Sequence, residues 1–222
     1  MDFIFMLTCE DRTVADCLAV LDAVAPLGLG HIGFKDIGVP PATLRSLCKA
    51  IRAQGAESYL EVVATGEAAA LNAARLGAEL GVAHLLGGTQ VEETLRILEG
   101  SGAKYYPFPG RPEGHPTMLR GDPALVEAQC RAFMAQGCAG VDLLAYRALE
   151  AEPLDLVRAA RRGCGAHGRL ICAGGIDRPA RIAALAAAGA DAFTVGSAAF
   201  NGAFLAAAPG LEAQLRAILA CG

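Results

Sequence analysis

Residues 170–200 read LICAGGIDRPARIAALAAAGADAFTVGSAAF and contain one complete strand–helix–strand unit. Apolar runs predict buried strands at Arg169–Ala173 and Ala192–Gly196, and the apolar spacing between them predicts a helix at Arg178–Ala188. Two strands joined by a helix in this way form a parallel βαβ unit. The question is then how often this unit recurs along the chain.

The alternation of strand and helix runs from end to end. The other predicted strands are Asp2–Thr8, His31–Gly38, Ser58–Ala64, His84–Gly88, Lys104–Pro109 and Gly140–Tyr146, and the other predicted helices are Val14–Leu27, Ala42–Gln54, Glu67–Leu80, Glu92–Leu98, Pro123–Gln136, Pro153–Arg162 and Leu211–Leu219. Eight units in 222 residues leave about 28 residues per unit, which favours a closed parallel (β/α)8 TIM barrel forming a single domain over 1–222. The alternative is a doubly wound open sheet. Its GxGxxG fingerprint is missing, because the first strand is followed by TCEDR at 8–12.

Composition narrows the classes of function. The chain has 19 basic and 23 acidic side chains, so it lacks the basic excess of a nucleic-acid-binding surface. An apolar share of 54% excludes a disordered chain. The first residues, MDFIFMLT, lack the basic start of a secretory signal, and the charge-free stretch 192–210 is weakly hydrophobic for its length. We therefore expect a cytoplasmic protein with no nucleic-acid and no membrane partner.

The eight cysteines show no CxxC and no zinc-ligand spacing. They are interpreted as free thiols in a reducing compartment. Cys9 is singled out because it follows the first strand. No metal site is predicted.

The period of two in a strand places three charged side chains inside the predicted barrel. In HIGFKDIG, Ile32 and Phe34 suit the outer layer, so Lys35 faces the axis. The same reasoning turns Glu61 and Asp142 inward, and Lys35 and Glu61 belong to neighbouring strands. The three are candidate catalytic residues for acid–base chemistry, or for attack of a lysine on a carbonyl. A charge cluster that merely fills the barrel is the alternative.

Glycines at the ends of the last two strands indicate an anion site. Gly174 and Gly175 follow the seventh strand, and Gly196 and Ser197 follow the eighth and open a helical turn. Glycine allows close approach of the backbone, and amide groups at the start of a helix bind anions. In (β/α)8 barrels these two loops commonly hold a phosphate. Tight turns that need glycine are the alternative reading.

The run AGGI…GADAFTVGSAAF resembles the phosphate grip of the ribulose-phosphate-binding barrel superfamily, which implies phosphate on Gly174, Gly175, Gly196 and Ser197. The metal-dependent epimerase pattern is absent, since Gly33 stands where its metal-binding Asp is expected and Glu61 where its His is expected. The decarboxylase motif DxKxxD is missing from SYLEVVA, and Thr8 replaces the Asp of the histidine-pathway isomerase. GFKDI is similar to the lysine stretch of (5-formylfuran-3-yl)methyl phosphate synthase, which would make Lys35 the active lysine.

Further polar residues follow other strands and are candidate substrate contacts. Gly87, Gly88 and Thr89 follow the fourth strand. Arg111 and His115 lie in the proline-rich loop after the fifth, which is interpreted as a lid. Tyr146 and Arg147 end the sixth.

These residues predict a metal-independent enzyme without a cofactor that binds a small phosphorylated, sugar-like metabolite. The leading hypothesis is an isomerase or epimerase, in which Glu61 or Asp142 moves a proton beside a carbonyl and Lys35 stabilises the enolate. The first alternative is a Schiff-base aldolase, lyase or phosphate-ester synthase that uses Lys35. The second is a non-catalytic phosphometabolite-binding barrel. A homo-oligomer is possible.

Overall fold

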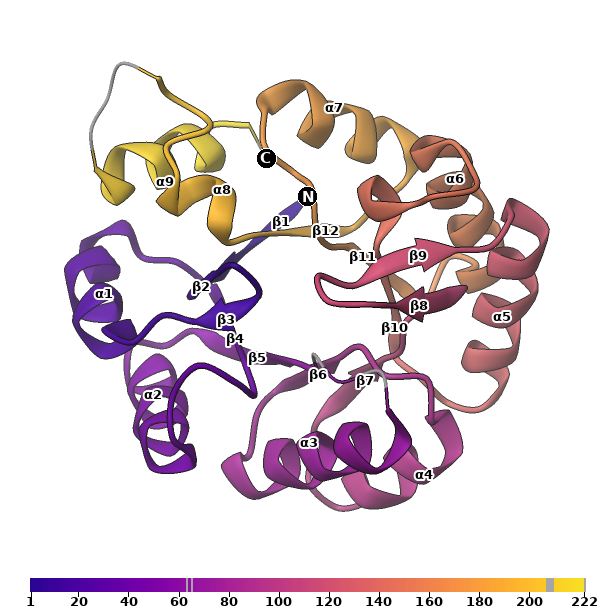
Figure 1. The fold of residues 1–222 in the computed structure, drawn as a ribbon, viewed down its shortest axis with the longest axis horizontal. Coiled ribbons are helices and arrows are strands. Elements are labelled where there is room, and N and C mark those ends of the chain that lie inside the picture. The colour runs from indigo at the N-terminus through magenta and orange to yellow at the C-terminus, as the bar shows by residue number, and fades with distance from the viewer. Residues whose placement is uncertain (63, 65, 207–209, 222) are drawn as a thin grey trace.

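The computed structural model describes residues 1–62, 64, 66–206 and 210–221. Its main sheet is parallel throughout, in the order β10-β11-β12-β1-β4-β5-β6-β7. The strands are β1 (Asp2–Met6), β4 (His31–Lys35), β5 (Glu57–Glu61), β6 (His84–Leu86), β7 (Lys104–Tyr106), β10 (Gly140–Leu143), β11 (Arg169–Cys172) and β12 (Ala192–Val195). The amides of Ala139 and Asp142 donate to the carbonyls of Tyr105 and Pro107, each at 3.0 Å, and so join β10 to β7. The predicted (β/α)8 barrel is confirmed (Figure 1).

Helices surround this barrel on its outside (Figure 1). They are α1 (Cys17–Val24), α2 (Pro41–Ala53), α3 (Glu67–Leu80), α4 (Val91–Leu98), α5 (Pro123–Ala135), α6 (Pro153–Cys164), α7 (Pro179–Ala188), α8 (Ser197–Phe200) and α9 (Leu211–Leu219). The bounds of α3 and α9 are those predicted. The predicted helix Val14–Leu27 is wrong at both ends, because residues 14–16 form a turn before α1 and the 3-10 turn η1 (Ala25–Leu27) replaces its last turn.

Several predicted strands extend too far toward their carboxyl ends. The apolar run continues past the last paired residue, but the chain there has already turned into the loops of the barrel mouth. The run Gly140–Tyr146, for example, leaves the sheet after Leu143 and forms the 3-10 turn η2 (Ala145–Arg147). Residue 63 of the predicted strand Ser58–Ala64 lies outside the described residues.

Two antiparallel hairpins at the carboxyl ends of the strands were not predicted. One pairs β2 (Thr8–Cys9) with β3 (Arg12–Thr13), and the other pairs β8 (Arg111–Glu113) with β9 (Met118–Arg120). Both project toward the centre of the view in Figure 1. The proline-rich loop after β7 that was interpreted as a lid is thus partly a hairpin, which forms despite Pro112 because this hairpin is a separate two-stranded sheet.

The barrel interior has its own apolar cluster. It consists of Ile4, Met6, Tyr59, Leu86, Tyr106, Ile171 and Ala192, whereas Ile32 and Phe34 belong to the larger cluster between strands and helices. A Cβ on Gly33 would lie 2.2 Å from the Met6 sulfur, so Gly33 faces the interior and leaves room for Met6. The predicted alternation of inward and outward side chains on β4 is confirmed.

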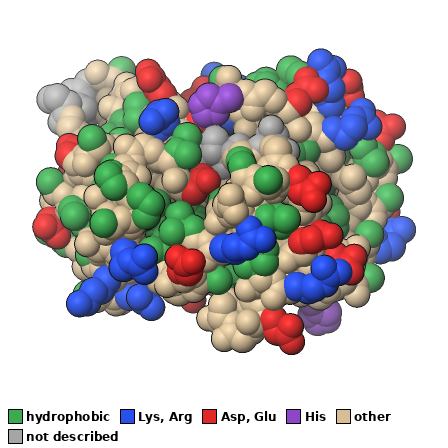
Figure 2. Space-filling view, turned by 60° about the horizontal axis from the view of Figure 1, so that its bottom comes forward, with side chains coloured by type: hydrophobic (Ala, Val, Ile, Leu, Met, Phe, Trp, Pro, Cys, Tyr) green, Lys and Arg blue, Asp and Glu red, His purple; other side chains and the backbone are tan. Residues whose placement is uncertain are grey.

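Acidic and basic side chains are interspersed with apolar ones over the face shown in Figure 2. No helix among the described residues has the length and apolar character needed to span a bilayer.

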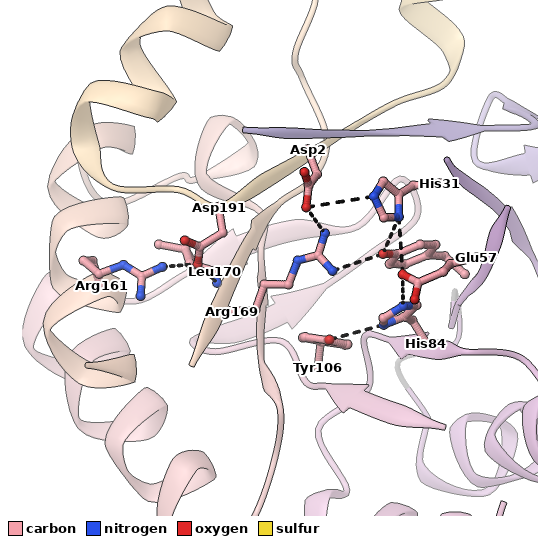
Figure 3. A network of polar contacts seen from close by, with 10 residues as sticks. Asp2, His31, Glu57, His84, Tyr106, Arg161, Arg169, Leu170 and Asp191 are labelled. Carbon is pink, nitrogen blue, oxygen red and sulfur yellow. Dashed lines mark hydrogen bonds and ion pairs between the residues drawn. The ribbon is translucent and has the colours of Figure 1, made fainter. Parts of the chain in front are cut away.

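Polar side chains from the first residues of several strands interact at the amino-terminal end of the barrel (Figure 3). The buried His84 contacts Glu57 at 2.9 Å, and its ring stacks on Tyr59 with centroids 4.0 Å apart. Arg169 pairs with Asp2 at 2.7 Å and donates to the Tyr59 hydroxyl at 3.2 Å. Burial lowers the pKa of His84 to about 4 despite the opposing effect of Glu57, so the ring is neutral at pH 7. This end of the barrel is held by a network of its own, opposite the mouth.

Candidate functional site

A cavity of about 210 Å³ opens at the carboxyl ends of the strands. It contains the four residues predicted to bind phosphate together with Lys35 and Glu61, which lie more than a hundred positions earlier in the chain. Its lining consists of Met6, Thr8, Asp11, Lys35, Glu61, Arg147, Gly174, Gly175, Ile176, Asp177, Thr194, Val195, Gly196, Ser197 and Ala198. The barrel therefore brings two of the three charged candidates and all the glycine-corner residues to one space.

The glycine corners have no room for side chains. Gly174 and Gly175 have φ values of +74° and +71°, which other residues rarely adopt. A Cβ on Gly174 would lie 2.4 Å from Nε of Arg147, and one on Gly196 would lie 2.5 Å from Oγ1 of Thr8. All three glycines line the cavity, so their backbone faces it, as close contact between amide groups and a ligand requires.

Ser197 begins α8, and the first amide groups of a helix have no acceptor within it. Its hydroxyl accepts a hydrogen bond of 3.0 Å from the backbone amide of Glu10, at the tip of the β2–β3 hairpin. The amides of Gly174 and Gly175 have no backbone acceptor among the described residues. These groups form a set of donors suited to an anion.

Lys35 lies between two carboxylates. Its Nζ is 2.7 Å from Oδ1 of Asp11 and 3.2 Å from Oε1 of Glu61, and only 6% of the side chain is exposed. Its backbone is held on both sides by the Thr13 hydroxyl, which donates to the Lys35 carbonyl and accepts from its amide. Burial alone would lower the pKa of Lys35, but Glu61 and Asp11 raise it above its usual value. Lys35 is therefore an ammonium ion.

Asp11 and Asp177 are the charged residues of the cavity lining that sequence reasoning missed, and Asp11 is the one that contacts Lys35. It follows Glu10 in the turn of the β2–β3 hairpin, and both residues have positive φ, 50° and 58°. Its carboxylate accepts two hydrogen bonds of 3.0 Å from Arg147 in addition to that from Lys35. Burial favours the neutral acid, but these partners hold the pKa of Asp11 well below its usual range. An acidic pair directly after the first strand, at the catalytic face of a barrel, was the available signal.

Asp142 lies on β10 and is fully buried, with 0% exposure. Neither carboxyl oxygen has a hydrogen-bond partner among the described residues. Burial, and then the charge of Glu61, raise the pKa of Asp142 well above its usual value. The inward orientation is as predicted, but Asp142 is no lining residue of the cavity. It is a buried acid outside the cavity lining, and burial favours its neutral form.

Arg147 and Tyr146 follow β10 and have different surroundings. Arg147 lines the cavity and also donates to the Thr117 carbonyl at 3.2 Å, which connects the β2–β3 hairpin to the turn of the β8–β9 hairpin. Tyr146 lies behind Gly175, and its ring supports the guanidinium of Arg181 at 4.6 Å. Of the two, the structure places Arg147 in the cavity and Tyr146 in the wall that supports it.

The remaining predicted substrate contacts lie apart from this cavity. Gly88, Thr89 and Arg111 line a second cavity of about 290 Å³, and Gly87 packs against Phe108. Arg111 pairs with Glu150 at 3.3 Å. His115 is exposed in the turn of the β8–β9 hairpin. These residues are grouped around that hairpin rather than around Lys35.

The eight cysteines are free thiols, and Cys9 is half-buried in β2 outside the cavity lining. Within the described part of the chain, no group of three or more His, Cys, Asp and Glu side chains is arranged to hold a metal ion.

Searches with protein-family models and among curated proteins find no match to this chain. Solved structures do match over nearly its whole length. Orotidine 5′-phosphate decarboxylase from Pyrococcus horikoshii has a TM-score of 0.63 at 15% identity and covers 99% of this chain and 98% of its own. A structure described as native KDPGal has a TM-score of 0.69 at 12% identity, covering 100% and 96%. The tryptophan synthase complex from Pyrococcus furiosus has a TM-score of 0.69 at 17% identity, covering 99% and 98%. The chain thus shares the (β/α)8-barrel fold of these three proteins.

Proposed function

We propose that this protein is a metal-independent enzyme that moves a proton next to a carbonyl in a small phosphorylated, sugar-like metabolite, as an isomerase or epimerase does. The observation that carries the proposal is the position of the Lys35 ammonium. It is fixed between Asp11 and Glu61 in the cavity whose other side is formed by the two glycine corners.

The phosphate end of the substrate is assigned to the glycine corners. Gly174, Gly175, Gly196 and Ser197 expose backbone to the cavity, and amide groups there can surround a dianion. The Arg147 side chain, whose guanidinium is paired with Asp11, passes beside Gly174 at the same corner. A named substrate of one neighbour in the comparisons, orotidine 5′-phosphate, also carries a phosphate.

The reacting carbon is assigned to the space beside Lys35 and Glu61. Glu61 accepts the proton from the carbon next to the carbonyl, and Lys35, 3.2 Å from Glu61, stabilises the negative oxygen of the enolate as a fixed charge. Glu61 then returns the proton to the neighbouring carbon in an isomerase, or to the opposite face of the same carbon, after the planar enolate has turned over in the cavity, in an epimerase. Asp142, neutral and buried near Glu61, keeps a second negative charge away from the developing enolate.

The rival Schiff-base reaction requires an uncharged Lys35 amine that attacks the carbonyl. Two carboxylates within 3.2 Å of Nζ oppose loss of the proton, which favours an electrostatic role for Lys35. The same pairing supports catalysis over simple binding, because it sets a fixed cation and a carboxylate side by side in the cavity that also contains the glycine corners.

The proposal is tested by hydrogen exchange in D2O with a panel of aldose and ketose phosphates, followed by NMR. The wild-type protein is expected to introduce deuterium next to the carbonyl of its substrate. Glu61→Gln is expected to slow this exchange by at least about a hundredfold while the phosphate compound still binds. Glu92→Gln, an exposed substitution on α4, serves as the matched control and should leave the rate unchanged.

Borohydride reduction separates the alternatives. With substrate present, the mass of the protein should stay unchanged. A substrate adduct at Lys35 would establish the Schiff-base reaction instead. Binding without exchange or product, in wild-type protein, would establish the non-catalytic barrel.

A further inference from the structure

The hydroxyl groups of two threonines in the cavity make no hydrogen bond within the described part of the folded chain. Thr8 and Thr194 are each only 5% exposed, and both line the cavity. Neither hydroxyl has a hydrogen-bond partner among the described residues. Neither hydroxyl is among the fully buried atoms that lack a partner, so both are accessible from the cavity and free to hydrogen-bond to a ligand there.

Their positions place both hydroxyls next to the phosphate corner. Thr194 pairs in register with Ile4, whose side chain belongs to the barrel interior, and it precedes Gly196 by two residues on the same face of β12. The Thr8 hydroxyl is 2.5 Å from the point that a Cβ on Gly196 would occupy. A molecule held at Gly196 therefore has hydroxyl groups beside it as it extends into the barrel.

The charges of the cavity determine what else can bind there. The lining has two cations, Lys35 and Arg147, and both are already paired. Lys35 contacts Asp11 and Glu61, and both terminal nitrogens of Arg147 contact Asp11.

The lining also contains a third acid, Asp177, which is paired with Arg178 and Arg181 outside the lining. Acids outnumber cations in the lining by three to two. A second anionic group on the ligand would meet carboxylates and no unpaired cation.

Resting on the phosphate site proposed above, we infer that the rest of the substrate is an uncharged polyhydroxy chain whose hydroxyl or carbonyl oxygens hydrogen-bond to Thr8 and Thr194. The substrate class is a sugar phosphate without a carboxylate. Its hydroxyls supply partners for the two threonines, and the lack of a second charge matches the paired ions.

Isothermal titration calorimetry of the full chain tests this substrate class. The ligands are inorganic phosphate and three pairs of phosphate esters, and the two members of each pair differ only in whether the terminal carbon is an aldehyde or a carboxylate. The pairs are glyceraldehyde 3-phosphate and 3-phosphoglycerate, ribose 5-phosphate and 5-phosphoribonate, and glucose 6-phosphate and 6-phosphogluconate. At least one neutral sugar phosphate should bind tenfold or more tightly than both its acid partner and inorganic phosphate. Tighter binding of an acid, or no neutral compound binding better than inorganic phosphate, overturns the inference.

Thr194→Val keeps the shape of the side chain and removes its hydroxyl. It should weaken binding of the preferred sugar phosphate about five- to tenfold, the effect of one neutral hydrogen bond, and leave inorganic phosphate affinity unchanged. Thr194→Ser should restore the affinity, and Thr8→Val should repeat the loss. An equal loss for inorganic phosphate would assign the hydroxyls to the phosphate and refute their role here, as would no loss for the sugar phosphate.

The two levels of proposal fail separately. If inorganic phosphate and every phosphate ester leave the heat of titration unchanged, the phosphate site itself is wrong. If they bind without preference for the neutral partner, only the inference on the substrate class is wrong.

Discussion

Asp142→Asn should change how the stability of the protein depends on pH. The carboxyl group is fully buried with both oxygens unpaired, and its pKa in the folded protein is raised by burial and by Glu61. In the unfolded chain its pKa is about 3.9. The folded state therefore retains a proton that the unfolded state releases above that pH. The stability that this proton provides is present below pH 3.9 and is lost as the pH rises toward the folded pKa.

The magnitude follows from the linkage relation. Between pH 4.5 and 5.5 the unfolded Asp is mostly ionised and the folded one, with its raised pKa, holds its proton longer, so the free energy of unfolding of the wild type falls relative to the variant, with a limiting slope of about 1.4 kcal/mol per pH unit. Urea denaturation of both proteins at several pH values measures this difference. Asp155→Asn, an exposed substitution on α6, is the matched control and should give a curve parallel to the wild type. A constant difference between wild type and Asp142→Asn would show that Asp142 is ionised in the folded protein and refute the reasoning.

Two further predictions concern packing and the opposite end of the barrel. Gly33→Ala should lower the free energy of unfolding by about 1–3 kcal/mol, because the new methyl group would overlap the Met6 sulfur. The control Gly30→Ala has open space around it and should change the free energy of unfolding by less than about 0.5 kcal/mol. Equal effects of the two substitutions in urea denaturation would contradict this prediction. Burial holds the pKa of His84 at about 4, below its unfolded value, so its neutral form stabilises the fold above about pH 6.5 and that stability is lost as the pH falls toward 4. Relative to His84→Gln, the wild type should lose about 2–3 kcal/mol over this range, and parallel pH curves would show that the buried ring does not resist protonation.

The barrel and the positions of its inward side chains were predictable because they depend on local periodicity. Strand alternation alone placed Lys35 next to Glu61, and the structure finds them 3.2 Å apart. The glycine corners were also readable, since positive φ at Gly174 and Gly175 is a property of those residues themselves. Each of these signals is local, because it is carried by residues that follow one another closely along the chain.

What was missed depends on contacts between distant segments. Nothing periodic in TCEDRT shows that Glu10 and Asp11 adopt positive φ and turn the chain back over Lys35. The partner that holds Asp11 there, Arg147, is 136 positions away. Likewise, Arg111 was expected to contact the substrate because its loop lies at the mouth of the barrel. Arg111 is instead part of the β8–β9 hairpin, where it pairs with Glu150.

The two polar ends of the barrel are separated by a layer of packed side chains that includes Ile4, Met6 and Ile171. Charges at the Lys35 end and at the His84 end are consequently held in separate polar networks. Substitutions at the amino-terminal ends of the strands can therefore be chosen for heat resistance without changing the residues around Lys35. Redesign of the barrel mouth likewise leaves the His84 network in place.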